Sequence, residues 1–157
     1  MIVYHASYTE IRKPDISFSR EGLDFGRGFY VTKLQTQAEN YAQKFKLRGK
    51  AAIINIYEFP DNITESINYK IFEVYDEEWL DFIIANRSGS DCNHYDIVEG
   101  GVADDKIFRT IDLYFSGDIS KEEALGRLRF EHTNHQICLS SQSVIDNYLN
   151  FLSSIKL

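Results

Sequence analysis

The chain has 157 residues, of which 43% are hydrophobic and 26% charged, as expected for one ordinary globular domain rather than a disordered chain. Its formal net charge of -7 argues against double-stranded nucleic acid as a simple electrostatic partner, because phosphate binding needs a basic face. That charge still allows a local basic pocket for a single dinucleotide.

The sequence lacks the features of secreted and membrane proteins. Its two cysteines, Cys92 and Cys138, lie far apart, whereas small secreted domains more often carry several paired cysteines. No N-terminal apolar stretch resembles a signal peptide, and no apolar run approaches the roughly 20 residues of a membrane helix. With no linker or repeat in view, residues 1–157 are expected to form one cytoplasmic domain.

The first half of the chain predicts three strands and one helix. A strand over residues 2–7 is followed by a polar segment and then by a short strand over residues 28–32. Thr36 and Glu39 fit a capping box that begins an amphipathic helix, which ends before the next glycine. Residues 51–59 are dense in isoleucine and predict a strand that is buried on both faces.

The second half predicts four helices and two strands. The first three, in chain order, are a helix capped by Asp76, a strand over residues 95–99 and a helix over residues 103–115. A short helix begun by a Ser120–Glu123 capping box and a strand over residues 136–139 follow. The last helix is capped by Ser143 and includes Ile155. Strands and helices are interspersed without a regular βαβ rhythm, so the expected fold class is α+β.

Familiar nucleotide-binding loops are missing from the sequence. There is no GxGxxG that opens a helix and no GxxxxGK[ST], and the pair Gly26 and Gly28 leads into a strand rather than a helix. A Rossmann or P-loop site is therefore not expected.

His5 is the first candidate for a site residue. It stands near the end of the first predicted strand, beside Ala6 and Ser7. An imidazole offers one donor and one acceptor, which suits ribose hydroxyls. A lone histidine is more often a satisfied structural residue, so on this segment alone both interpretations stay open.

The segment over residues 24–32 is the second candidate. Its glycines would let the backbone approach a flat ligand closely, and Tyr30 could stack on a heterocycle such as nicotinamide. The alternative is a turn that feeds a strand with an aromatic core residue. Arg20 and Arg27 are the nearest candidates for a pyrophosphate group, although both could equally be solvated loop charges.

Together these segments resemble the ADP-ribosyltransferase superfamily, in its diphtheria-toxin-like and poly(ADP-ribose)-polymerase-like branch. The blocks that carry the resemblance are His5-Ala-Ser7, Gly26-Arg-Gly-Phe-Tyr30 and Ala38-Glu-Asn-Tyr-Ala42. Over nearly its full length the chain is still more similar to a poorly characterised bacterial family placed in that superfamily, through Trp79 to Ile83, Tyr95 to Asp105 and Gln136-Ile137.

The resemblance implies a fold and a set of roles around NAD. The fold would be a split, curved pair of small sheets with a cleft between them. His5 would bind the ribose, the Ala6 backbone would contact the nicotinamide amide with support from Ser7, and Tyr30 would stack on the nicotinamide. The matching blocks also place Gly28, Phe29 and Tyr41 at the dinucleotide, and Arg20 is expected there as the pyrophosphate candidate named above.

The third catalytic position of the superfamily is often a glutamate on a late strand, and here the candidate is Gln136. Glutamine can hydrogen-bond the ribose but cannot act as a general base, and the loss of a charged stabiliser could cost several kcal/mol of barrier. The trio of His5, Tyr30 and Gln136 would then suggest single ADP-ribose transfer or an inactive site. Glu131 lies nearby in sequence and is expected to be a solvated turn carboxylate.

Acidic and histidine residues elsewhere raise two further possibilities. Glu99, Asp104 and Asp105 form an acidic block around two glycines. Glu99 or Asp104 could bind substrate or activate an acceptor. Alternatively, the block could supply negative charge at a helix N-terminus next to a turn. His132 and His135 have no apparent third ligand, so no metal site is predicted.

The leading hypothesis is a mono-ADP-ribosyltransferase that consumes NAD and uses no metal. Its acceptor could be a protein, a nucleic acid or a small molecule, and by analogy with the superfamily it could be a toxin held by a cognate antitoxin. The first alternative is a weak or inactive module that binds NAD or ADP-ribose. A third is a structural or interaction protein with its aromatic residues in the core.

Overall fold

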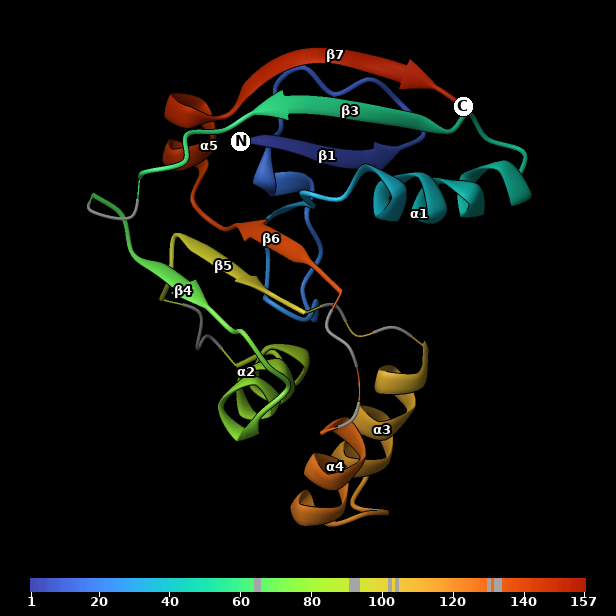
Figure 1. Ribbon diagram of the computed structural model, residues 1–157, viewed down its shortest axis with the longest axis vertical. Coiled ribbons are helices and arrows are strands. Elements are labelled where there is room, and N and C mark those ends of the chain that lie inside the picture. The colour runs from blue at the N-terminus through green and yellow to red at the C-terminus, as the bar shows by residue number, and fades with distance from the viewer. Residues whose placement is uncertain (64–65, 91–93, 102, 104, 130, 132–133) are drawn as a thin grey trace.

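The computed structural model describes residues 1–63, 66–90, 94–101, 103, 105–129, 131 and 134–157. Two small sheets and five helices make up an α+β architecture (Figure 1). The upper sheet in Figure 1 is antiparallel and has the order β1-β3-β7, with strands Ile2–Ser7, Ile53–Glu58 and Asn150–Lys156.

The second sheet is mixed and has the order β2-β6-β5-β4. Only β4 and β5 run parallel. Its strands are Phe29–Val31, Gln136–Leu139, Ile97–Gly100 and Tyr69–Ile71. In both sheets some neighbouring strands are far apart in the sequence, and only β4 and β5 are parallel, which explains why no regular βαβ rhythm is visible along the chain.

The helices cover separate parts of the two sheets (Figure 1). One lies along the upper sheet, one lies beside the junction of β6 and β7, and three gather beyond the lower sheet. In chain order they are α1 (Gln35–Leu47), α2 (Glu77–Arg87), α3 (Asp105–Phe115), α4 (Lys121–Leu128) and α5 (Gln142–Tyr148), with a short 3-10 turn η1 (Ile16–Phe18) before β2. No helix among the described residues is long and apolar enough to cross a membrane.

Alternation along the strands places side chains on opposite faces of the lower sheet. Ile137 of β6 packs in a cluster with Val3 and Tyr57 of the upper sheet, so this cluster joins the two sheets. Cys138, the next residue, belongs instead to a cluster on the far face, with Trp79 of α2 and the helices around it. We refer to the face of the lower sheet that carries Ile137 as the inner face and to the face that carries Cys138 as the outer face.

A third cluster seats α1 on the upper sheet. Ala38 and Ala42 of the helix pack against Ala6 of β1 and Ile54 of β3. Because these alanines carry only a methyl group, the helix can approach the strands closely.

The two sheets meet along one edge strand of each. β1 and β2 are linked by an isolated antiparallel bridge, in which the N–H groups of Tyr4 and Thr32 each donate to the carbonyl oxygen of the other, at 2.8 and 2.9 Å. No further bridge between these strands is formed in the described part of the chain, so the pairing stops after Tyr4.

Several predicted elements are confirmed. β1 and β6 have the predicted bounds, and Asp76 caps α2 by accepting from the Trp79 N–H at 2.9 Å. Ser120 caps α4 in the same way, accepting from the Glu123 N–H at 3.1 Å.

Two predicted caps are wrong. Thr36 lies inside α1, whose N-cap is Leu34 and makes no side-chain capping bond. Ser141, not Ser143, caps α5 by accepting from the Val144 N–H.

The predicted last helix is also wrong in its second half. α5 ends at Tyr148, and residues 150–156 form β7. Pairing with β3 satisfies the backbone of this segment, and that long-range pairing overrides the local helical spacing of its apolar residues. The short strand β4 was not predicted at all.

Candidate functional site

His5 is fixed at the point where the two sheets separate. Its ring stacks on Phe29 of β2 with ring centroids 4.3 Å apart. Its Nδ1 atom lies 2.7 Å from the carbonyl oxygen of Tyr30. A carbonyl oxygen only accepts, so Nδ1 carries the proton and donates. In the neutral ring Nε2 is then an acceptor.

The acceptor atom of His5 is available to a ligand. Among the described residues no hydrogen-bond partner meets Nε2, and the side chain is only partly buried. Burial lowers the pKa of His5, the hydrogen bond to Tyr30 opposes this, and the charge of Lys44 lowers the pKa further. The neutral ring with an open Nε2 is therefore favoured.

Ala6 presents main-chain groups at the same place. Successive residues of an antiparallel strand turn their N–H and C=O groups to alternate edges. The Tyr4 groups point toward β2, as the bridge to Thr32 shows, so those of Ala6 point the same way. Because the pairing has stopped there, Ala6 has no strand partner at this edge. Its methyl group faces α1 in the third cluster, and the residue is 8% exposed.

Tyr30 is positioned through its hydroxyl group. The hydroxyl donates to the carbonyl oxygen of Gly26 at 2.5 Å and accepts from the Phe25 N–H at 3.1 Å. Burial raises the pKa of the Tyr30 phenol, and the nearby Cys138 thiol raises it further. The hydroxyl is thus unsuited to acid–base work, and what Tyr30 can offer a ligand is its ring.

Gly28 is required by the close approach of the neighbouring strand β6. A Cβ atom at this position would lie 2.5 Å from the Cys138 sulfur and 2.7 Å from the Leu139 carbonyl oxygen, both on β6. The absence of a side chain at Gly28 therefore lets the segment that enters β2 pack closely on β6.

Gln136 begins β6 and lies on the outer face of the lower sheet, two residues from Cys138. Tyr30 is paired with Cys138, so the side chains of Tyr30 and Gln136 share that face. Gln136 is buried, and its amide nitrogen lies 3.5 Å from the carbonyl oxygen of Gly101. An uncharged amide is compatible with this environment.

The fold brings the three predicted residues onto adjoining strands but not onto one face. Tyr30 and Gln136 lie on the outer face, whereas the His5 ring stacks on Phe29, which belongs to the inner face. His5 touches the main chain of Tyr30 and not its ring. A ligand shared by all three would have to pass over the edge of β2.

The remaining predicted site residues have mixed surroundings. Ser7 is buried and its hydroxyl accepts from the Thr9 N–H at 3.3 Å. Arg20 is exposed on the loop before β2, as is Arg27, which contacts the Ser17 carbonyl oxygen at 3.4 Å. Tyr41 is 55% exposed on α1.

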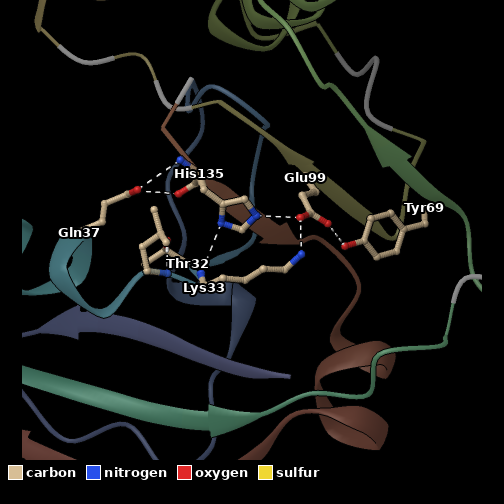
Figure 2. A network of polar contacts seen from close by, with 7 residues as sticks. Thr32, Lys33, Gln37, Tyr69, Glu99 and His135 are labelled. Carbon is tan, nitrogen blue, oxygen red and sulfur yellow. Dashed lines mark hydrogen bonds and ion pairs between the residues drawn. The ribbon is translucent and has the colours of Figure 1, made fainter. Parts of the chain in front are cut away.

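A polar network that the sequence only partly indicated lies on the inner face of the lower sheet. Figure 2 shows Glu99 at its centre, with one side chain from each neighbouring segment turned toward it. The Glu99 carboxylate accepts from Lys33 Nζ at 2.6 Å, from His135 Nε2 at 2.7 Å and from the Tyr69 hydroxyl. The network therefore links β4 and β5 with the residues that flank β2 and β6.

His135 is held on both sides. Its Nδ1 atom accepts from the Lys33 N–H at 3.3 Å, so its Nε2 atom carries the proton donated to Glu99. Gln37 of α1 donates to the His135 carbonyl oxygen at 2.6 Å and accepts from its N–H at 3.2 Å (Figure 2). Because His135 directly precedes Gln136, this clamp fixes the start of β6.

Glu99 is ionised within this network. Burial alone would raise its pKa, but the hydrogen bonds from His135, Lys33 and Tyr69 outweigh burial and lower the pKa to about 2. Both carboxylate oxygens are engaged, which indicates a structural and electrostatic role. Glu99 itself lies inside β5, whereas helix α3 begins at Asp105 of the same block, where the sequence allowed for helix N-terminal charge.

Other candidates from the sequence behave differently. Glu131 is not a solvated turn carboxylate, since its side chain is 19% exposed and pairs with Lys106 at 2.6 Å. Burial raises the pKa of the Cys138 thiol to about 11, so this cysteine is a poor nucleophile. Asp104, His132 and Cys92 lie outside the described residues. In the part of the chain that is described, no group of three or more histidine, cysteine or carboxylate side chains could hold a metal ion.

Two surface hollows lie away from His5. One, of about 580 Å³, is lined by α3 and the turn after it, and we refer to it as the α3 hollow. The other, of about 550 Å³, lies between residues 73–77 and α4. Neither is lined by His5, Tyr30 or Gln136.

Lys33, Tyr69 and Gln37 were missed by sequence reasoning. They come from different segments, and no local motif marks any of them. Only the strand order brings Lys33 and Tyr69 to Glu99.

Comparison with known proteins adds a family but no activity. No curated protein and no solved structure matches the chain. A family model described as "Protein of unknown function (DUF3990)" matches residues 1–151. Since this covers nearly the whole of the chain, the protein belongs to the DUF3990 family.

Proposed function

We propose that this protein is an NAD-dependent mono-ADP-ribosyltransferase whose site lies where β1 and β2 separate. The observation that carries the proposal is that, within the described part of the chain, two adjacent residues both present hydrogen-bonding groups without a protein partner. His5 offers the acceptor Nε2 on a fixed ring, and Ala6 offers main-chain groups without a strand partner.

These groups complement the nicotinamide riboside half of NAD. A carboxamide has one carbonyl acceptor and one amino donor, which match the N–H and C=O of Ala6. A ribose hydroxyl would donate to Nε2 of His5. The amino acid sequence supports the same assignment through its resemblance to the ADP-ribosyltransferase superfamily, and the two separate small sheets are compatible with the split-sheet fold of that superfamily.

The reaction would break the bond between the ribose C1′ and the nicotinamide nitrogen. Nicotinamide leaves with the bonding electron pair as a neutral molecule. An acceptor O–H or N–H group then bonds to C1′ and releases its proton to solvent. Positive charge develops on the ribose on the way, and fixed dipoles aimed at it stabilise the transition state.

In this proposal Tyr30 contributes its ring to the nicotinamide and Gln136 orients the ribose. Both assignments require the dinucleotide to cross the edge of β2, since their side chains lie on the outer face. The uncharged Gln136 favours single transfer over polymer formation.

A second candidate function is an NAD- or ADP-ribose-binding module without turnover. It is favoured by the same residue, because Gln136 is buried and lacks the charge that would stabilise an oxocarbenium-like centre. A ligand that binds only the native state stabilises it by mass action, so this module would show a rise in Tm with NAD but release no nicotinamide.

The experiment that tests the proposal measures nicotinamide release from NAD by the wild-type protein, His5→Ala and His94→Ala. His94 is an exposed histidine away from β1 and serves as the matched control. The proposal expects release by the wild type and by His94→Ala, with a loss of about 100-fold or more in His5→Ala. Equal release by the two variants would contradict it, and a thermal shift without release would favour the binding module.

A further inference from the structure

The carboxyl end of α1 carries an unusual density of cations for an acidic chain. Lys44, Lys46, Arg48 and Lys50 occur within seven residues, and no aspartate or glutamate stands between Glu39 and Glu58. Among the described residues none of these four cations pairs with a carboxylate. Many of the other lysines and arginines, such as Lys33, Lys70 and Lys106, do form such pairs.

Aromatic rings lie between these cations. Lys50 Nζ lies 4.6 Å from the centre of the Tyr8 ring, and Lys44 Nζ lies 3.3 Å from the centre of the Tyr41 ring. Phe45 links the two, with ring centroids 6.0 Å from Tyr8 and 6.1 Å from Tyr41. The result is a row in which three rings, those of Tyr8, Phe45 and Tyr41, lie between Lys50 and Lys44. We refer to these residues, together with the exposed Lys46 and Arg48, as the α1 surface.

Stability alone does not account for this surface. The helix dipole favours cations in a last turn, which explains Lys44 and Lys46. It gives no reason for rings that stay open to solvent, and Tyr8 and Tyr41 are 52% and 55% exposed. Leu47, the last residue of α1, is 88% exposed.

The α1 surface borders the site proposed above. Tyr8 follows the last residue of β1, and Figure 1 shows the carboxyl ends of β1 and α1 at the same end of the upper sheet. The charge of Lys44 is close enough to lower the pKa of His5, in addition to the larger effect of burial. A molecule bound on this surface would therefore lie beside His5.

We propose that the α1 surface binds single-stranded nucleic acid. Cations without a carboxylate partner attract the phosphate backbone, and exposed rings stack on bases, which is how proteins bind single strands without reading their sequence. In a duplex the bases are stacked on one another and cannot reach Tyr8 or Tyr41. The net charge of -7 repels the polyanion from the rest of the molecule and confines binding to this face.

A bound strand would lie beside His5 and could serve as the acceptor of ADP-ribose, and that role rests on the proposed function. The binding of the strand to the α1 surface does not. Binding can therefore be measured without NAD, and its failure is distinguishable from a failure to release nicotinamide. The probe is a fluorescein-labelled oligothymidylate of about 12 nucleotides, a length within the range of known single-strand sites.

Fluorescence anisotropy would compare the wild type with three variants of the full chain. Lys46→Glu/Arg48→Glu reverses charge on the α1 surface, and Tyr8→Ala/Tyr41→Ala removes its rings. Lys13→Glu/Arg109→Glu makes the same change in net charge at exposed positions elsewhere. Circular dichroism and thermal unfolding would establish that each variant is folded.

We expect Kd to rise about tenfold or more for each α1-surface variant and to stay within about twofold for the control, with a weaker salt dependence after charge reversal. The single strand should bind more tightly than its duplex, and NAD should not displace it. Equal effects in all charge variants would overturn the proposal. The absence of oligonucleotide binding to the wild type would also overturn it, whatever the result with NAD. So would binding of an acidic peptide or a phosphatidylserine vesicle in place of the oligonucleotide.

Discussion

The Nδ1 atom of His5 donates a hydrogen bond of 2.7 Å to the carbonyl oxygen of Tyr30, and this bond joins the edge strands of the two sheets just where their pairing ends. It fixes the tautomer of the ring and so decides which nitrogen faces a ligand. The proposed function depends on that choice, because only an unprotonated Nε2 can accept from a ribose hydroxyl.

The pH dependence of NAD cleavage follows from the same bond. The folded protein lowers the pKa of His5, so the neutral ring, and the activity that needs it, is present above that pKa and is lost as pH falls through it. Lys44 contributes to the lowering, so Lys44→Gln should move the acid limb of the nicotinamide-release profile to higher pH. Lys46→Gln is the control, and an identical shift in both variants would contradict the assignment.

Replacing Gln136 tests whether the uncharged side chain at the third catalytic position limits the rate. Gln136→Glu would place a carboxylate near developing positive charge and should raise the rate of nicotinamide release, by tenfold or more if it supplies even about 1.4 kcal/mol. The same change buries a charge beside the Gly101 carbonyl oxygen, so Tm should fall. Gln136→Ala should lower the rate instead. A glutamate variant that is as slow as the alanine variant would argue against Gln136 as a ribose contact.

Glu99 should dominate the stability of the lower sheet near neutral pH. Its folded-state pKa of about 2 lies below the ordinary value of 4.5, so its contribution is present above about 4.5 and is lost as pH falls toward 2. That difference corresponds to on the order of 3 kcal/mol. Urea unfolding should show Glu99→Gln to be strongly destabilised at pH near 7 and close to the wild type only as the pH approaches 2.

The control for Glu99 is Glu123→Gln. Glu123 forms an exposed ion pair with Arg127 four residues later in α4, where the expected loss is within about 1 kcal/mol. Losses of equal size in the two variants would show that the Glu99 network is no more than a surface ion pair.

Gly28 should tolerate no side chain. In Gly28→Ala the new methyl would meet the Cys138 sulfur and the β6 backbone, which should cost about 1–3 kcal/mol of unfolding free energy. Gly126 is the matched control, because a Cβ there meets nothing within 4 Å and lies in the interior of α4. Gly126→Ala should stabilise the protein by up to about 1 kcal/mol. Chemical denaturation measures both, and a neutral Gly28→Ala would contradict the close packing of β2 on β6.

Local signals predicted much of the fold. Strands such as β1 and β6 and the caps Asp76 and Ser120 could be located from the sequence, because alternation and capping depend on neighbouring residues. β7 could not, since Phe151 and Ile155 continue a helical spacing and become a strand only by pairing with β3. β4 has three residues and pairs in parallel with a distant strand, which leaves almost no local trace.

The candidate site shows the same division. His5, Ala6 and Tyr30 could be nominated because their motifs are contiguous, but the sequence could not show that Tyr30 and His5 occupy different faces. It also could not assemble the partners of Glu99, because Lys33, Tyr69 and His135 meet only once four strands are ordered.

The most direct test of the central claim is an NMR titration of the protein with NAD, which follows the backbone amide resonances. We expect the largest shifts on His5, Ala6 and Ser7 at the end of β1, with the largest of all on Ala6 because its N–H donates to the nicotinamide carboxamide. Shifts that are confined to the α3 hollow, or the absence of any shift at saturating NAD, would contradict the placement of the dinucleotide between β1 and β2.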